Sequence, residues 1–138
     1  MTTEKKKKIT KFFLYGTLKE GRPLDRKMFA DLRTSVLPAK IKGSIFNLGP
    51  YPTIKLDGKG LVIGEVHEFP EDRVKDVLRA MDGIEGYNAS YPDKGLYNRH
   101  KVKATLPDGK VVTAWTYEYN GSVDPKRRLD DGVWEPGK

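Results

Sequence analysis

The alternation of hydrophobic and polar residues along the chain becomes distinct close to its start. Ile9 and the apolar run at residues 12–14 predict a buried strand over residues 9–15, which ends at Gly16. A helix is predicted next, over residues 23–32, because its apolar side chains recur at helical spacing: Leu24, Met28, Phe29 and Leu32. The chain therefore opens with a strand, a glycine turn and a helix.

The middle of the chain is predicted to be mainly extended. Residues 36–48 mix apolar and polar positions in the manner of a strand, with Gly43 as a candidate bulge. Residues 47–52 are predicted to form a loop, because two prolines bias the residues before them away from helix. The apolar stretch 61–69 is the clearest strand, and an Asp-Gly turn before it indicates a hairpin with the segment around Lys55.

A second helix is predicted to begin at Pro70, since proline is favoured at the first helical position and two acidic residues follow it. Gly83 and Gly86 break this helix, so Glu85 between them lies at the helix exit. Its inward face repeats at helical spacing over four residues: Val74, Val77, Leu78 and Met81.

The chain closes with a surface loop over residues 88–96 and a predicted hairpin. Two extended runs, 97–106 and 110–119, are joined by a Pro-Asp-Gly turn. Six or so strands with two helices predict an α+β domain built on a largely antiparallel, mixed sheet.

Length and charge bound the organisation of the chain. Its 138 residues suit one domain, and we predict a basic disordered tail over residues 1–8, a domain over 9–122 and a C-terminal extension over 123–138, packing on the domain or trailing from it. The formal net charge is +7, and residues 5–8 are all lysine. No RNA-binding aromatic signature or helix-turn-helix spacing accompanies these lysines. A solvated basic surface therefore explains the positive charge better than nucleic-acid binding does.

Composition also excludes several kinds of site. The absence of cysteine removes disulfides, thiolate nucleophiles and Cys-based zinc sites. Glu65 and His67 share one face of a strand, but two ligands do not make a zinc site, so we expect no metal. No apolar run reaches membrane-spanning length and the start lacks the core of a signal peptide, so we expect a cytoplasmic protein.

The turn at Gly16 is the first candidate for chemistry. A glycine leaves neighbouring amide N–H groups unscreened, and the Thr17 hydroxyl lies beside it. Free N–H groups between a strand and a helix favour a carboxylate or an oxyanion. Because most strands that end in glycine simply turn there, this stretch needs support from elsewhere in the chain.

That support comes from three later stretches, which read Gly-Pro-Tyr-Pro at 49–52, Met-Asp-Gly-Ile-Glu-Gly-Tyr at 81–87 and Tyr-Asn-Arg at 97–99. With the Tyr-Gly-Thr-Leu turn at 15–18, their order resembles the γ-glutamylcyclotransferase superfamily, in particular its γ-glutamylamine cyclotransferase and AIG2-like branch, over residues 11–119. The resemblance implies a small barrel flanked by helices. It also implies a cofactor-free reaction that cyclises a γ-glutamyl amide to 5-oxo-L-proline and releases an amine.

The resemblance assigns roles to five residues. Glu85 stands at the family's catalytic position, and the substrate-binding turn is Tyr15, Gly16, Thr17 and Leu18. A glutamate is a poor base at its ordinary pKa, so we expect burial to raise the pKa of Glu85. Whether the turn holds the substrate's carboxylate or the oxyanion stays open.

Neighbouring residues carry weaker predictions. Asp82 is expected to bond to backbone at the helix end, and Arg99 to pair with a buried acid. Four tyrosines belong either to the cavity or to the core: Tyr51, Tyr87, Tyr97 and Tyr117.

Two other functions stay open: a protein that binds γ-glutamyl compounds without turnover, and a basic protein that associates with nucleic acid. The leaving amine is also open, because the loop between Gly86 and Tyr97 is long beside the family's compact form. It could be the lysine of an isopeptide, another amine, an amino acid or an antibiotic precursor.

Overall fold

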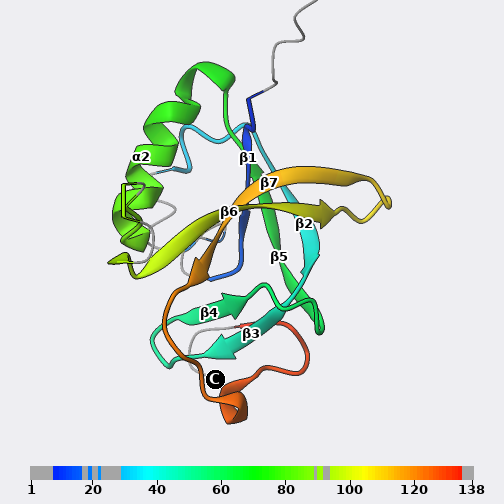
Figure 1. The fold of residues 1–138 in the computed structure, drawn as a ribbon. Helices are drawn as coiled ribbons and strands as arrows, with labels where there is room; N and C mark the ends of the chain where they lie inside the picture. Colours follow the sequence, from blue (N-terminus) through cyan, green and yellow to red (C-terminus); the bar gives the residue numbers. More distant parts are fainter. Residues whose placement is uncertain are drawn as a thin grey trace, which may run out of the picture.

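The computed structural model describes residues 8–16, 19, 22, 29–88, 90–91 and 94–134. Figure 1 shows a barrel with a helix against its side and a small sheet at one end. The elements in chain order are β1 (Lys11–Leu14), β2 (Ser35–Lys42), β3 (Ser44–Asn47), β4 (Pro52–Lys55), β5 (Leu61–Glu68), η1 (Glu71–Arg73), α2 (Val74–Glu85), β6 (Tyr97–Thr105), β7 (Val111–Tyr119) and η3 (Pro125–Arg127).

Five strands close into a barrel in the order β1, β5, β2, β6 and β7. Four of the strand pairs are antiparallel. The barrel closes where β1 runs parallel to β7, with Phe12 opposite Trp115. The fold is therefore the mixed, largely antiparallel β-barrel of an α+β domain, as expected, and the predicted hairpin of β6 and β7 is confirmed.

The short strands β3 and β4 form a separate two-stranded sheet. The predicted hairpin between the segment around Lys55 and the strand at 61–69 is therefore wrong, because β5 pairs with β1 and β2 instead. The extended stretch 36–48 is also divided at Gly43 between the barrel and the small sheet. Alternation identifies which residues of a strand face inward, but it does not identify the partner strand.

The described part of the C-terminal segment packs on β3. Trp134 is only 3% exposed, and its indole N–H donates to the side-chain oxygen of Asn47 at 3.1 Å. The backbone N–H of Leu129 donates to the carbonyl of Ile45 at 2.8 Å. The domain boundaries stay predictions.

Alternate residues of β1 contribute to two apolar cores, because successive side chains of a strand point to opposite faces. Phe13 of β1, and Tyr15 just after the strand, belong to the core inside the barrel. Phe12 and Leu14 belong to a second core, which lies against α2. The packing of α2 against the barrel therefore depends directly on β1.

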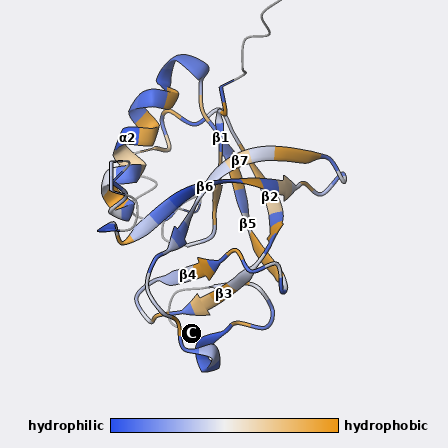
Figure 2. Ribbon diagram, viewed as in Figure 1, coloured by the Kyte–Doolittle hydropathy of each residue, from blue (hydrophilic) through white to orange (hydrophobic). Residues whose placement is uncertain are grey.

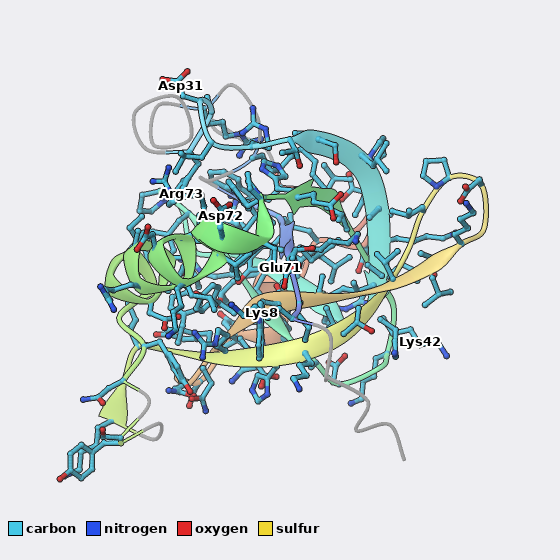
Figure 3. All side chains as sticks on the ribbon, turned by 90° about the horizontal axis from the view of Figure 1, so that it is seen from above. Lys8, Asp31, Lys42, Glu71, Asp72 and Arg73 are labelled. Atoms are coloured by element: carbon cyan, nitrogen blue, oxygen red, sulfur yellow. The ribbon has the colours of Figure 1, made fainter. Side chains whose placement is uncertain are left out.

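Helix α2 is amphipathic, as the sequence predicts, and a short turn of 3-10 helix, η1, precedes it. Apolar and polar colours alternate along it in Figure 2. Its buried residues are Val74, Val77 and Met81. The charged side chains of Glu71 and Asp72, labelled with Arg73 before the helix in Figure 3, are exposed to solvent.

Most of the first predicted helix, residues 23–28, lies outside the described residues. Residues 29–32 form a turn, in which the N–H groups of Leu32 and Arg33 both donate to the carbonyl of Phe29. Among the described residues, α2 is therefore the single main helix. No helix in that part of the chain is long and apolar enough to cross a membrane.

Candidate active site

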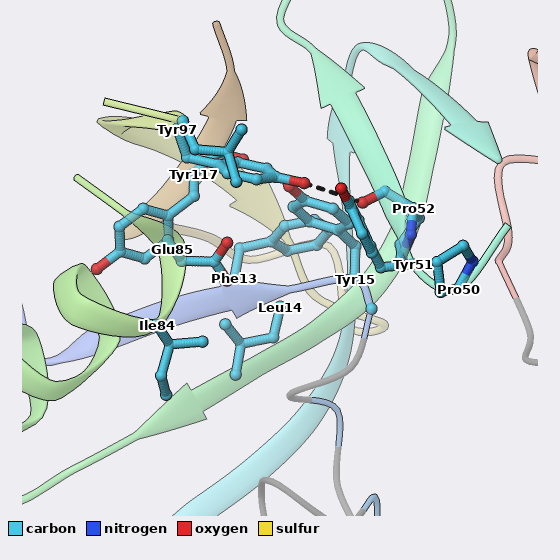
Figure 4. A pocket seen from close by; sticks show the side chains of 12 residues that line it. Phe13, Leu14, Tyr15, Pro50, Tyr51, Pro52, Ile84, Glu85, Tyr97 and Tyr117 are labelled. Atoms are coloured by element: carbon cyan, nitrogen blue, oxygen red, sulfur yellow. Dashed lines mark hydrogen bonds between the residues drawn. The ribbon is translucent and has the colours of Figure 1, made fainter. Parts of the chain in front are cut away.

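A cavity of about 330 Å³ opens where the end of β1 meets the end of α2. Figure 4 shows the side chains that surround it. Glu85 and Gly16, which are far apart in the sequence, both line this cavity. Its described lining consists of Phe13, Leu14, Tyr15, Gly16, Pro50, Tyr51, Pro52, Ile84, Glu85, Leu96, Tyr97 and Tyr117.

Glu85 is the last residue of α2, and Gly86 ends the helix in the left-handed conformation with φ 66°. Glycine adopts this conformation without steric penalty, and the N–H of Tyr87 then bonds back to the carbonyl of Asp82 at 2.9 Å. The helix therefore ends immediately after the acid, whose carboxyl group points into the cavity (Figure 4).

The surroundings of Glu85 disfavour its charged form. Burial raises its pKa from 4.5 to about 7. Among the described residues, no hydrogen bond or ion pair stabilises its carboxylate. A carboxyl group with this pKa exchanges protons readily near neutral pH, which is the property that a general acid or base requires.

Three tyrosines surround this acid: Tyr15, Tyr97 and Tyr117. Burial raises the pKa of each hydroxyl above its ordinary value, and the negative charge of Glu85 raises it further. The three hydroxyls therefore keep their protons near neutral pH. Tyr97 donates to the carbonyl of Pro52 at 3.3 Å.

Gly16 is buried against the loop that precedes β4. A Cβ atom on Gly16 would lie 2.7 Å from Cγ and 2.9 Å from Cδ of Pro52. Real Cβ atoms essentially never approach other atoms so closely, and the proline ring cannot rotate away. The absence of a side chain therefore brings the turn and this loop together at the cavity wall.

We expect Gly16→Ala to lower the free energy of unfolding by about 1–3 kcal/mol, because either the turn or Pro52 must move. Thermal or urea denaturation measures the change. Gly83→Ala is the matched control, since a Cβ atom added to this residue of α2 would meet no other part of the protein within 4 Å. That control should be neutral or mildly stabilising. Equal stability of the two variants would contradict close packing at Gly16.

Tyr117 connects the two sides of the cavity. Its backbone carbonyl accepts a hydrogen bond from the Tyr15 hydroxyl at 2.6 Å, and its own hydroxyl donates to Oδ1 of Asp82 at 2.6 Å. Asp82 lies one turn before Glu85 on α2. The strand that leads to the glycine turn and the helix that carries the acid are thus both held by one residue of β7.

Arg99 completes this connection. It donates to Oδ2 of Asp82 at 2.7 Å, and its guanidinium group lies 5.0 Å from the ring centre of Tyr87 and 4.7 Å from that of Trp115. The predicted pairing of Arg99 with an acid is confirmed, although this acid is half-buried and not fully buried. The predicted backbone role of the Asp82 side chain is wrong, because both its oxygens accept from side chains on β6 and β7.

Three of the five residues predicted for the site, Tyr15, Gly16 and Glu85, line the cavity. Thr17 and Leu18 lie outside the described residues. Of the four candidate tyrosines, Tyr51, Tyr97 and Tyr117 line the cavity, whereas Tyr87 stacks on Arg99.

Sequence reasoning missed Leu96 and Ile84 as part of the lining. Ile84 precedes the acid and could have been inferred from its position. Leu96 ends a polar loop, and only its apolar character next to Gly95 could have drawn attention to it.

Comparison with known proteins identifies the family of the chain. A sequence model described as "Gamma-glutamyl cyclotransferase, AIG2-like" matches residues 12–136 of the chain. A search of curated proteins found no significant match.

Several solved structures share the fold. An AIG2-like protein from Mus musculus is 23% identical, with a TM-score of 0.66, over 92% of this chain and 88% of that one. The Arabidopsis thaliana protein At3g28950.1 is 25% identical, with a TM-score of 0.64, over 97% and 74%. YkqA from Bacillus subtilis is 23% identical, with a TM-score of 0.61, over 91% of this chain, which spans only 39% of YkqA.

Proposed function

The chain belongs to the AIG2-like γ-glutamylcyclotransferase family, and from this premise we propose that it cyclises a γ-glutamyl amide to 5-oxo-L-proline with release of a free amine. The observation that supports the proposal is the presence of Glu85 and Gly16 on one cavity. A carboxyl group with a raised pKa and a glycine turn are the two parts that this reaction requires.

The reaction needs little other chemical equipment. Nucleophile and electrophile belong to one molecule, so holding it in a folded conformation gains the large effective molarity of a ring closure. The α-amino nitrogen attacks the γ-carbonyl carbon, and the bond from that carbon to the amine nitrogen breaks.

Proton transfer is the task of Glu85. Its carboxylate takes one proton from the substrate's α-ammonium group, which frees the nucleophile, and returns this proton to the departing nitrogen. The surplus proton on the ring nitrogen leaves with the released amine, which becomes an ammonium ion. One carboxyl group in a partly dehydrated cavity can serve both steps.

The turn at residues 15–18 is proposed to hold the anionic part of the substrate. Gly16 is buried at the cavity wall, and its carbonyl oxygen accepts from Nη1 of Arg22 at 2.9 Å and from the backbone N–H of Lys19 at 3.1 Å. These bonds fix the orientation of the peptide group that begins the turn. Removing one donor that stabilises an oxyanion commonly costs about 2.7–4 kcal/mol of barrier.

The pH dependence of turnover follows from the raised pKa of Glu85. The base must be ionised before it can accept a proton, so kcat/KM should rise with pH and level off above a midpoint near the pKa of about 7. An ordinary exposed glutamate would instead give a midpoint about 2–3 pH units lower. Initial rates between pH 4 and pH 9 decide between the two, and a profile without a rise near pH 7 would contradict a Glu85 base with a raised pKa.

The proposal is tested by incubating the protein with γ-glutamylamines and measuring 5-oxoproline and free amine. Release of both supports a cyclotransferase. Binding of these compounds in a thermal-shift assay without any product would instead indicate a binding protein.

A further inference from the structure

Two of the side chains that line the cavity are both apolar and exposed to solvent. Leu96 is 50% exposed and Tyr51 is 38% exposed, although both line the cavity. Seven other lining residues are buried: Phe13, Leu14, Tyr15, Gly16, Pro52, Tyr97 and Tyr117. Pro50 is exposed as well. This difference in exposure identifies the mouth of the cavity, which we define as the three exposed lining residues Pro50, Tyr51 and Leu96.

Backbone hydrogen bonds hold the mouth in place. The N–H of Leu96 donates to the carbonyl of Gly86 at 3.0 Å, and its own carbonyl accepts from the N–H of Asn120 at 3.0 Å. Tyr51 lies between two prolines, and its carbonyl accepts from the N–H of Leu48 at 3.0 Å. An apolar surface that is already ordered loses little conformational entropy when it binds a ligand.

The position of the mouth relative to Glu85 determines what it can contact. Under the proposed function, the γ-glutamyl part lies inside, between Glu85 and the glycine turn. The group attached to the leaving nitrogen must then point outward, toward the exposed end of the cavity. There it meets Tyr51 and Leu96, because they are the exposed apolar side chains of the lining.

The charge on Glu85 disfavours a carboxylate on the group attached to the leaving nitrogen. Glu85 is the only ionisable acid or base, tyrosine hydroxyls apart, among the described residues that line the cavity. In a γ-glutamyl amino acid, a carboxylate lies two bonds from the leaving nitrogen, which Glu85 must approach to protonate. While Glu85 is still the carboxylate that must accept the first proton, these two like charges repel each other, and no lysine or arginine in the described lining offsets the repulsion.

We infer that the mouth formed by Pro50, Tyr51 and Leu96 is a subsite for an uncharged apolar group on the leaving amine. This inference rests on the proposed function. The preferred substrates are then γ-glutamyl amides of aromatic or branched aliphatic amines.

Three compounds test the subsite: γ-glutamyl-benzylamide, γ-glutamyl-methylamide and γ-glutamylglycine. We expect kcat/KM for the benzylamide to exceed that for the methylamide by about 10- to 100-fold, since a benzyl group contacts apolar surface that a methyl group does not reach. γ-Glutamylglycine should be the poorest of the three. Equal values for benzylamide and methylamide, or a preference for γ-glutamylglycine, would overturn the inference.

Leu96→Asp tests the residue itself. It should lower kcat/KM for the benzylamide at least about tenfold and change that for the methylamide by less than about twofold. Leu61→Asp is the matched control, because Leu61 is 49% exposed but does not line the cavity. Loss on both substrates, or loss in the control, would contradict a subsite at Leu96.

The two proposals can fail separately. If none of the three compounds releases 5-oxoproline, the proposed reaction is wrong, and the subsite is judged by binding alone. The benzylamide should then raise the Tm of the Glu85→Gln protein more than the methylamide does, and Leu96→Asp in that background should remove the difference. Equal shifts from the two compounds would overturn the subsite as well.

Discussion

Replacing Glu85 by glutamine is expected to lower 5-oxoproline release by about 10²- to 10⁴-fold, the usual contribution of general acid–base catalysis. Glutamine has nearly the same shape but cannot accept a proton from the α-ammonium group. The measurement is the rate of product release at pH 8. Glu71→Gln provides the control, because Glu71 is an exposed acid before the same helix that does not line the cavity.

The same substitution should make the protein more stable at high pH. The pKa of Glu85 is raised from 4.5 to about 7 in the folded protein, so between these values the folded state binds more protons than the unfolded state. The contribution of Glu85 to stability therefore falls as pH rises through this window and stays low above it.

Glutamine does not ionise, so Glu85→Gln should raise the free energy of unfolding by about 1–3 kcal/mol at pH 8 and leave it nearly unchanged at pH 4. Urea denaturation at both pH values measures this difference. Retained turnover in the variant would remove Glu85 from its catalytic role. An equal change in stability at the two pH values would mean that the ionisation of Glu85 is not the cause.

Replacing Asp82 by alanine is expected to lower the free energy of unfolding by about 2–3 kcal/mol. Without Asp82, the Arg99 guanidinium and the Tyr117 hydroxyl both lose their acceptor in a partly buried place. The two ionic side chains are 18% and 22% exposed, so the effect should be smaller than for a fully buried pair. Asp76→Ala is the control on the same helix, since its ion pair with Arg73 is exposed and should contribute less than about 0.5 kcal/mol.

Asp82→Ala should also slow turnover, because Asp82 holds the end of α2 against β6 and β7. A loosened helix end admits water to Glu85 and lowers its pKa toward the ordinary value. The midpoint of the kcat/KM profile should therefore move to lower pH, a shift that a loss of folded protein alone would not produce. An unchanged midpoint, with stability equal to that of Asp76→Ala, would contradict this positioning role.

Local pattern was sufficient to predict several elements of the fold. The inward face of α2 depends on residues three and four positions apart, and the hairpin of β6 and β7 depends on a Pro-Asp-Gly turn. Both signals lie within one segment. The position of Glu85 at the helix end also follows from Gly86 beside it, whereas the predicted helix break at Gly83 is wrong, because α2 continues through that residue.

Contacts between distant segments could not be predicted in the same way. Strand β4 carries no signal that selects β3 over β5, because both choices satisfy its apolar face. Asp82 finds its partners on β6 and β7, at Arg99 and Tyr117, and helix-end chemistry alone suggests a backbone role. The barrel was expected from the family resemblance, and the structure then placed Glu85 and Gly16 on one cavity.

The proposed reaction is tested most directly with γ-glutamyl-benzylamide that carries ¹⁵N only at its α-amino group, followed by NMR. Attack by that nitrogen predicts 5-oxoproline with ¹⁵N in its ring and an equimolar amount of unlabelled benzylamine. Labelled glutamate in place of 5-oxoproline would mean hydrolysis by water, and unchanged substrate would mean no reaction; either result would contradict a cyclotransferase.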